Sequence, residues 1–440
     1  MSDREMSLQK RSKWSWYFYD FGNSAYASII LLAVYSAFFK NVVVGGAEGT
    51  RLWSIAVGIA SVTVAILSPV LGTIADFTKF KKQFLIFFTL ISVVFTGLLF
   101  FVRAGNVFIG MVFFILAEIG YRAGQMFYDA LLTDVSTPET IGTISGNGWA
   151  FGMIGGVLAL VIAIIPIQFV GDHTIPFAFL IASLFFLFSS IPSFLWVKER
   201  KQAEGIPAGE TVLSLAGKKL LDTVRSIRKY KEFSKYTVAF LLYNNGLMML
   251  MSFAAIIGTT LFGLSQMELI IFVIILQVTG AFGALGFGKV ADMQNSKASA
   301  IITLLLLSLT LCCLFFTTSK ALFFVIGAFA GIFLSGAQTV SRSIVGQLAP
   351  PDHVTEFFGF LSVAGSASTF IGPFVFGTVT FRMHNWYKNN GQGEILAEKN
   401  SLLWGIGSII AFLIVGCILF LLVKRITVKS KTADINGGKQ

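Results

Sequence analysis

This 440-residue chain contains twelve apolar runs, each long enough to cross a membrane. Hydrophobic residues make up 55% of the chain and charged residues only 12%, about half the charge content of a soluble domain. The sequence therefore predicts an all-α integral membrane protein with twelve transmembrane helices. The predicted spans are residues 15–40, 53–76, 83–102, 107–130, 145–168, 175–197, 236–262, 268–290, 298–318, 321–343, 357–381 and 402–423.

The distribution of lysine and arginine predicts the orientation of these spans. Twelve spans place both termini on one side, and that side carries 25 of the 33 basic residues, against seven on the other side and Arg122 within a span. Basic loops stay in the cytoplasm, so both termini are expected to be cytoplasmic, in the inner membrane of a bacterial cell. The net charge of +11 is then an orientation signal, and no nucleic-acid partner is expected.

A polar and basic connection divides six spans from six. It is expected to be a solvated linker that contacts anionic lipid, with a regulatory binding site as the alternative. The predicted organisation is a cytoplasmic tail over 1–13, a six-helix half over 14–197, the linker over 198–235, a second six-helix half over 236–425 and a tail over 426–440.

Two sequence patterns recur between the halves. GTIAD at the end of span 2 recurs as GKVAD at the end of span 8, 216 residues later. A second pattern aligns span 4 with span 10 at a shift of 213, which pairs Gln125 with Gln338. Repeated halves in a multi-pass protein indicate a transporter whose site lies between them. The matched residues of the first pattern are Gly72 with Gly288 and Asp76 with Asp292.

These motifs resemble those of the major facilitator superfamily. The repeated G-x-x-x-D followed by lysines is similar to its signature loop, and Arg122-x-x-Gln125 is similar to its span-4 motif. Within the superfamily, WSWYFYDFGNSAY, YNNG and SRSIVGQLAPPDHVTEFFGF resemble the branch of the fungal vacuolar amino-acid effluxer and its bacterial relatives. The resemblance covers roughly residues 14–425 and implies two pseudo-symmetric six-helix halves that move amino acids. The sequence departs from that branch at Asn245, where an acid is expected, and at Asp129, where asparagine is expected.

Span 4 carries a polar stripe inside an apolar run. Glu118, Arg122, Gln125 and Asp129 follow one another at intervals of 4, 3 and 4 residues, which places them on one helix face about 60° wide. Lipid does not tolerate such a face, so it must contact protein or a wet cavity. In the fold that the sequence resembles, spans 1, 4, 7 and 10 line the central cavity. The candidate substrate- or proton-binding residues on those spans are Asp20, Asn23, Glu118, Arg122, Gln125, Asn244, Asn245 and Gln338.

Structural roles are alternatives for several of these residues. Glu118 and Arg122 are an i,i+4 pair of opposite charge, which is also the spacing of a purely structural ion pair. Asp20 could instead pair structurally with a residue on a neighbouring helix. Asn244 and Asn245 could instead form hydrogen bonds only with the backbone. The glycines and aspartates of the repeated loop are expected at close helix contacts on the cytoplasmic face. Gly148, Gly152 and Gly156, four residues apart in span 5, predict close helix packing.

The sequence disfavours an enzyme. The three histidines fall in predicted loops, the three cysteines lie in apolar runs, and no acidic cluster has metal-ligand spacing. No metal or cofactor is expected, and the chain has no G-x-x-x-x-G-K-[ST] phosphate-binding loop. The predicted function is therefore secondary active transport of a small polar solute by alternating access. Amino acids are the first choice, and a sugar, a drug-like cation or a non-transporting receptor or scaffold are the alternatives.

Protons are the expected coupling ion, and a carboxylate is the expected carrier because no predicted span holds a histidine. Asp20 and Glu118 are the candidates. The protein is expected to act as a monomer in contact with membrane lipid.

A gating pair is also predicted. Asp129 and Arg342 are symmetry mates by the shift of 213, and both lie near the cytoplasmic ends of their spans. They are hypothesised to form an ion pair only when the transporter is closed on the cytoplasmic side. The alternative is that Asp129 pairs with Arg122 in its own half.

Overall fold

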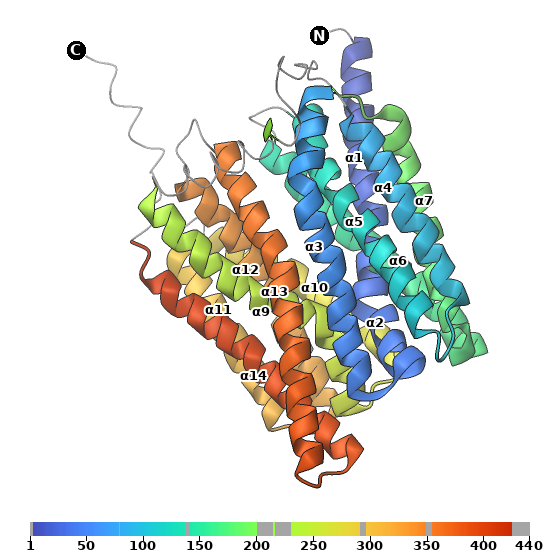
Figure 1. Cartoon of the computed structure of the whole chain (residues 1–440). Coiled ribbons are helices and arrows are strands. Elements are labelled where there is room, and N and C mark those ends of the chain that lie inside the picture. The colour runs from blue at the N-terminus through green and yellow to red at the C-terminus, as the bar shows by residue number, and fades with distance from the viewer. Residues whose placement is uncertain are drawn as a thin grey trace.

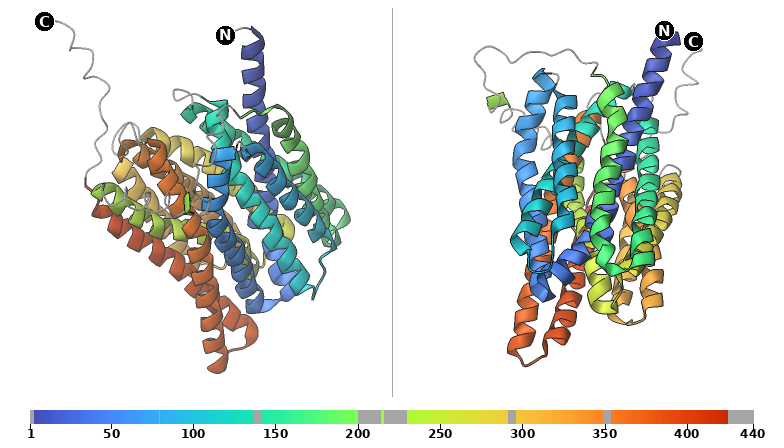
Figure 2. Two further views of the ribbon diagram at one scale, coloured as in Figure 1. Left: turned by 45° about the horizontal axis from the view of Figure 1, so that its top comes forward. Right: turned by 90° about the vertical axis from the view of Figure 1, so that its right-hand side faces the viewer.

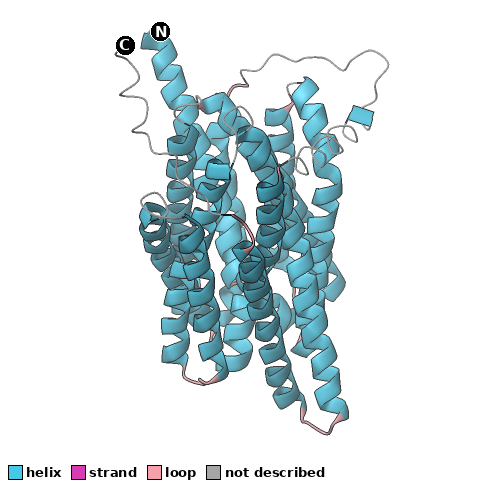
Figure 3. Ribbon diagram, turned by 90° about the vertical axis from the view of Figure 1, so that its left-hand side faces the viewer, coloured by secondary structure: helices cyan, strands magenta, loops and turns pink. Residues whose placement is uncertain are grey.

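The computed structural model describes residues 3–78, 80–136, 141–199, 214–215, 230–290, 296–348 and 354–424. Within these ranges every regular element is a helix (Figure 3). Eleven helical segments in the described ranges are long and apolar enough to cross a membrane. The predicted eleventh span lies in a further long helix, α13 (Val354–Asn389). The all-α membrane fold is thus confirmed.

The helices form two bundles that follow the two halves of the chain (Figure 1). The first bundle contains α1 (Asp3–Tyr26), η1 (Ala27–Ala33), α2 (Tyr35–Phe38), η2 (Phe39–Val44), α3 (Gly46–Thr78), α4 (Lys81–Leu98), η3 (Leu99–Phe101), α5 (Val107–Val135), α6 (Ile141–Val170), η4 (Asp172–Thr174) and α7 (Ile175–Trp196). The second contains α9 (Lys231–Phe262), α10 (Gln266–Val290), α11 (Ser296–Cys312), η6 (Cys313–Phe315), α12 (Lys320–Leu348), α13 and α14 (Glu394–Leu421).

The first span is not one regular α-helix. After Tyr26 the chain forms a seven-residue π-helix, η1, and a second π-helix, η2, follows the short α2. A π-helix shifts every later side chain around the helix axis and is frequent at functional sites. Tyr26 directly precedes η1, and its hydroxyl group belongs to the site described below.

Glycines of α6 allow close packing against α1, as the four-residue spacing predicts. A Cβ atom at Gly148 would lie 2.4 Å from the ring of Trp16, and one at Gly152 would lie 2.8 Å from Oδ2 of Asp20. A larger residue at either position would displace the side chain of Trp16 or Asp20. This contact also packs α6 against Asp20, which is only 9% exposed.

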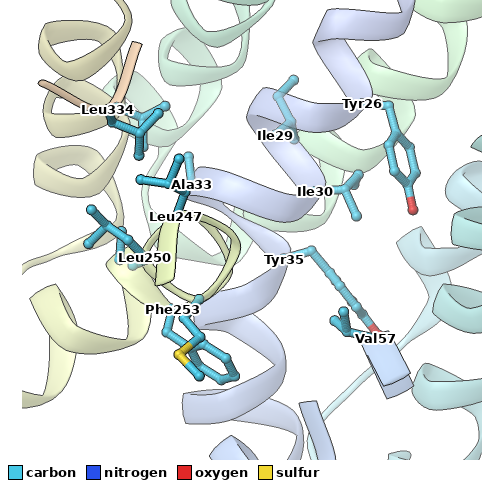
Figure 4. Close-up of a cluster of buried hydrophobic side chains, with 14 of the residues drawn as sticks. Tyr26, Ile29, Ile30, Ala33, Tyr35, Val57, Leu247, Leu250, Phe253 and Leu334 are labelled. Atoms are coloured by element: carbon cyan, nitrogen blue, oxygen red, sulfur yellow. The ribbon is translucent and has the colours of Figure 1, made fainter. Parts of the chain in front are cut away.

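The two bundles meet on one side of the molecule. We call the side where α1 begins the termini side, and the side of the turn between α13 and α14 the opposite side (Figures 1 and 2). Buried apolar side chains of both bundles belong to one cluster (Figure 4). The residues labelled there are Tyr26, Ile29, Ile30, Ala33, Tyr35, Val57, Leu247, Leu250, Phe253 and Leu334.

The bundles separate toward the termini side. The hydroxyl group of Ser61 on α3 donates to the carbonyl oxygen of Thr369 on α13 at 3.3 Å, near the middle of both helices. Beyond that point a Cβ atom at Gly72 of α3 or Gly365 of α13 would meet nothing within 4 Å. The two bundles thus diverge toward the termini side (Figure 1), and we describe this conformation as open on that side.

The close helix contact expected at Gly72 is absent from this conformation, because α3 and α13 have moved apart there. We expect that Gly72→Leu will be tolerated in the conformation shown and will obstruct closure of the termini side. Turnover should then fall far more than substrate affinity, which transport rates and binding isotherms on the purified variant would measure. Loss of affinity with normal turnover would contradict this role for Gly72.

Two helix boundaries were predicted wrongly. The sequence predicts a loop between 381 and 402, but α13 continues to Asn389 and α14 begins at Glu394. His384, expected in a loop, is a buried residue of α13, and its Nε2 atom lies 3.1 Å from Oε1 of Glu394. A helix can continue beyond the membrane into water. Its polar side chains are then solvated or paired, so a polar sequence does not mark the end of the helix.

Candidate functional site

A buried acid–base pair on α5 is the first element of the site. The Nε atom of Arg122 donates to Oε1 of Glu118 at 2.6 Å, as the i,i+4 spacing permits. The hydroxyl group of Tyr26 donates to the other carboxylate oxygen of Glu118 at 2.9 Å. The Glu118 side chain is fully buried, whereas that of Arg122 is 22% exposed. Both oxygens of Glu118 are thus occupied, and this carboxylate fixes the orientation of the arginine.

A chain of hydrogen bonds connects α1 to the end of the same stripe nearer the termini side. The amide nitrogen of Asn23 donates to Oε1 of Gln125. The amide nitrogen of Gln125 in turn donates to Oδ1 of Asp129 at 3.1 Å. Asp20 lies three residues before Asn23 on α1 and is buried. The structure therefore brings Asn23, Gln125 and Asp129 together.

Asp129 faces the second bundle. Its side chain is exposed, and its charge interacts with that of Arg342 on α12, which is exposed too. The charge of Asp20 also interacts with Arg342. In the described part of the chain no ion pair within 4 Å joins Asp129 to Arg342 or to Arg122, whose partner is Glu118. The cross-bundle pair is thus unformed in this conformation and stays a prediction.

The candidate residues of the second bundle differ in their contacts. The amide nitrogen of Asn245 donates to the carbonyl oxygen of Leu241 at 2.6 Å, which is the backbone alternative raised by the sequence. Asn244 is buried beside it. Gln338 is half-buried and its amide nitrogen lies 3.8 Å from the sulfur of Met251. Formal charge on the facing stripes is therefore concentrated in the first bundle.

Part of the predicted gating set lies outside the described part of the chain. This part comprises Asp292, the side chain of Asp76 and the surroundings of Gly288. On the same side of the molecule, Nζ of Lys81 and Oδ2 of Asp134 form a buried ion pair at 3.2 Å. Next to it the backbone nitrogen of Lys82 donates to Glu199, and burial raises the pKa of the Glu199 carboxyl group.

Sequence reasoning missed a buried ion pair on the opposite side. Lys40, in η2, lies with Nζ 2.5 Å from Oε1 of Glu398 on α14 and 2.7 Å from the hydroxyl oxygen of Thr260 on α9. Its side chain is 5% exposed. Among the ion pairs of the described residues, this one alone joins the two bundles. In the sequence, Lys40 is one of seven basic residues on the less basic side, and nothing local indicates its partners.

The polar cluster on α1 and α5 has an excess of negative charge. Asp20, Glu118 and Asp129 carry three formal negative charges, and Arg122 is the one basic residue on their stripe. Arg342 adds one positive charge from the second bundle. Within the described residues no group of three His, Cys, Asp or Glu side chains has metal-binding geometry. The arrangement suits a small ligand or a proton that brings positive charge to the carboxylates.

Comparison with known proteins decides the family. Residues 50–389 match the family model described as "Vacuole effluxer Atg22 like". The chain belongs to the Atg22-like family. YxiO of Bacillus subtilis, an uncharacterized MFS-type transporter, is 27% identical over 371 residues, which cover 82% of this chain and 86% of the relative. Autophagy-related protein 22-1 of Penicillium rubens is 26% identical over 263 residues, or 54% of this chain, and the match covers 44% of that longer protein.

Solved structures identify the fold of this Atg22-like protein. A bacterial homologue of the human lysosomal transporter Spinster, in an inward-facing and unoccupied conformation, matches with a TM-score of 0.70 at 13% identity, over 96% of this chain and 97% of that one. The nucleoside transporter NupG matches with a TM-score of 0.69 at 14% identity, over 94% and 100%. Together with the family match, these comparisons confirm a transporter of the major facilitator superfamily in the Atg22 branch.

Proposed function

We propose that this protein moves small zwitterions, amino acids first, across the membrane by proton-coupled alternating access. The observation that carries the proposal is the juxtaposition of a partly exposed arginine with carboxylates on one face of the first bundle. An arginine fork binds a carboxylate, and an aspartate binds an ammonium group, so the two together select a molecule that has both.

Arg122 is oriented for such a ligand. Its bond to Glu118 uses Nε, which leaves the two terminal nitrogens of the guanidinium group to bind a carboxylate in a bidentate manner. Asp129 lies two helical turns further along the same face and is exposed. Seven residues of α-helix span about 10 Å, which an amino acid and one ordered water can bridge.

The relatives support transport but not a particular solute. The family description names a vacuole effluxer, which favours export from a compartment as the direction. We further propose that both termini are cytoplasmic, in a bacterial inner membrane, because the sequence predicts 25 of the 33 basic residues on the same side of the membrane as the termini. The conformation shown would then be open to the cytoplasm.

Uptake of labelled amino acids into proteoliposomes tests the proposal. Purified protein should move at least one of a mixture of labelled amino acids, and an inwardly or outwardly directed pH gradient should drive accumulation. Arg122→Lys, which keeps the charge and loses the planar fork, should raise the concentration needed for half-maximal uptake about tenfold or more. Failure of every amino acid to move would remove this substrate class.

The two candidate proton carriers are expected to differ. Glu118 is fully buried between Arg122 and Tyr26, so Glu118→Gln should weaken substrate binding by releasing the arginine. Asp20 has no ion-pair partner within 4 Å among the described residues, so Asp20→Asn should abolish pH-driven accumulation and leave exchange of labelled for unlabelled substrate measurable. Continued accumulation by Asp20→Asn would show that the proton binds elsewhere.

A further inference from the structure

Two tyrosines of span 1 flank the π-helix η1, and both reach α5. The hydroxyl group of Tyr26, before η1, donates to Oε2 of Glu118 at 2.9 Å. The hydroxyl group of Tyr35, after η1, donates to the carbonyl oxygen of Gly110 at 2.9 Å. Both tyrosine side chains are fully buried. The two bonds therefore tie both ends of η1 to one helix of the first bundle.

The π-helix makes these two bonds compatible. At about 100° per residue, nine residues of unbroken α-helix would turn Tyr35 about 180° away from Tyr26. The wider turns of η1 change that angle. Figure 4 shows both rings on one side of span 1, with Ala33 on the other side toward Leu247 of α9. Conversion of η1 to an α-helix would therefore break at least one of the two tyrosine bonds.

The second bundle stabilises the π form of this segment. The backbone nitrogen of Val34 donates to the carbonyl oxygen of Ile29, five residues back, whereas that of Phe38 donates to Val34, four residues back. The change from five to four leaves one carbonyl oxygen in this interval without a backbone donor. Ala33 lies in the interval, and its carbonyl oxygen accepts from the amide nitrogen of Gln266 on α10 at 2.8 Å.

A second glutamine of α10 contacts the other end of η1. The amide nitrogen of Gln277 donates to the hydroxyl oxygen of Ser28 at 3.2 Å. Gln266 and Gln277 are eleven residues apart, which places them within about 20° of each other around the axis of α10. Gly156 of α6 leaves room for the contact, because a Cβ atom there would lie 2.5 Å from Ser28 Oγ and 3.0 Å from Gln277 Oε1. One face of α10 thus holds both ends of η1.

We infer that Gln266 and Gln277 are positioning residues for the substrate site, although they belong to the second bundle. They stabilise η1, and η1 places the hydroxyl group of Tyr26 on Glu118. Glu118 in turn orients the guanidinium group of Arg122. The inference rests on the proposed binding of the substrate carboxylate by Arg122, and it connects that binding to the contact between the bundles.

Of the two tyrosine bonds, that of Tyr26 is the one expected to break when η1 loses its partners. The ring of Tyr35 packs against Trp53, Phe114 and Phe179 of the first bundle. The ring of Tyr26 stacks on that of Tyr121, with centroids 4.5 Å apart. More aromatic contacts hold Tyr35 in place, so a rotation of span 1 is taken up at its Tyr26 end.

This connection makes substrate affinity depend on the conformation. In the conformation shown, α10 contacts η1 while the termini side is open, so Arg122 is oriented for a ligand that enters from that side. Opening of the opposite side separates the bundles and withdraws both glutamines. The hydroxyl group of Tyr26 then leaves Glu118, and the arginine loses its fixed orientation. Substrate is thereby bound on the termini side and released on the opposite side, which is the direction of export if the termini are cytoplasmic.

Exchange of labelled for unlabelled substrate in proteoliposomes tests the inference by double substitution. Gln266→Met keeps the size of the side chain and removes the donor, so it should raise the concentration for half-maximal exchange about fivefold. Tyr26→Phe should have an effect of similar size. The two substitutions together should raise the concentration no further than Tyr26→Phe alone, because both act through one contact. Gln277→Leu takes the place of Gln266→Met if that variant folds poorly.

Ser61→Ala is the matched control. Ser61 also donates a hydrogen bond from one bundle to the other, but its partner is the carbonyl oxygen of Thr369 on α13. Its effect on half-maximal exchange should be small and should add to that of Tyr26→Phe. Additive effects of Gln266→Met and Tyr26→Phe would overturn the inference, because independent effects exclude a shared route through Tyr26.

Hydrogen exchange of the substrate-free protein separates this inference from the proposed function. The backbone amides of η1 should exchange faster in Gln266→Met than in the wild-type protein, whichever solute the protein carries, and Ser61→Ala should leave them unchanged. Unchanged exchange of η1 in Gln266→Met would also overturn the inference. Failure of every amino acid to move, together with faster exchange of η1, would remove the proposed substrate class and leave the role of the glutamines in place.

Discussion

Lys40→Met is expected to move the protein out of the conformation shown and toward one that is open on the opposite side. Lys40 is buried between the bundles, within ion-pair distance of Glu398 and hydrogen-bond distance of Thr260. Methionine keeps the length of the side chain and leaves Glu398, with a 14% exposed side chain, without its cation. Breaking a buried pair in this way costs about 3–5 kcal/mol, which is a shift of about a hundredfold or more in the ratio of two conformations.

A cysteine at Ser54 can report this shift. The hydroxyl oxygen of Ser54 on α3 would lie 1.9 Å from a Cβ atom at Gly377 of α13, so this position is covered while the opposite side is closed. In a background without Cys312, Cys313 and Cys417, the Ser54→Cys thiol should react with a membrane-impermeant maleimide much faster when Lys40 is replaced.

Lys320→Met is the matched control for this experiment. Lys320 pairs with Glu268 on the same side of the molecule at 2.8 Å, but both residues belong to the second bundle and their side chains are 46% and 31% exposed. Exposed pairs contribute about 0–1 kcal/mol, so little change is expected. Equal labelling of Ser54→Cys with and without Lys40 would show that this ion pair does not hold the opposite side closed.

Local periodicity explains what the sequence predicts well. The stripe on α5 follows from intervals of 4, 3 and 4 residues, because the geometry of one helix places those side chains on one face without reference to the rest of the molecule. The glycines of α6 follow for the same reason. Twelve spans follow from the apolar runs, since a membrane requires length and composition that each segment carries by itself.

Contacts between distant segments explain what the sequence did not predict. Tyr26 reaches Glu118 from 92 residues away, and Lys40 reaches Thr260 from 220 residues away. Neither residue differs in its local pattern from an ordinary tyrosine or an interfacial lysine. The π-helix after Tyr26 has no local signal either, because ASIILLA is compatible with an α-helix. If the fold is known, the position of Lys40 at the end of a span, among buried residues, indicates that it has a buried partner.

The conformational state explains why the contact predicted at Gly72 is not seen in the structure. A contact between the bundles exists in one conformation of a transporter and not in the other. The glycine motif indicates that α3 comes close to another helix at some point of the cycle. The structure is open at that point, so the sequence and the structure describe different states of the same position.

The same reasoning predicts the behaviour of Asp129 and Arg342. Both side chains are exposed on facing helices near the termini side, and their charges interact without forming an ion pair within 4 Å. Closure of the termini side brings α5 and α12 together, and the two charges are then expected to meet. A partly buried pair of this kind biases two conformations by about 1–3 kcal/mol, or about tenfold or more.

Asp129→Asn should therefore favour the conformation open on the termini side. A cysteine at Gly365, whose Cβ position lies in open space here and is expected to be covered by α3 on closure, should become more reactive from the termini side. Arg342→Gln should have the same effect. Exchange of the two charges, Asp129→Arg with Arg342→Asp, should restore the original reactivity, because the attraction depends on opposite charge and not on which bundle carries which sign. The exchange also places a base at the end of the Asn23–Gln125 chain, so reactivity is compared at a pH where the carboxyl groups are ionised. A double variant that labels as fast as either single one would exclude the gating pair.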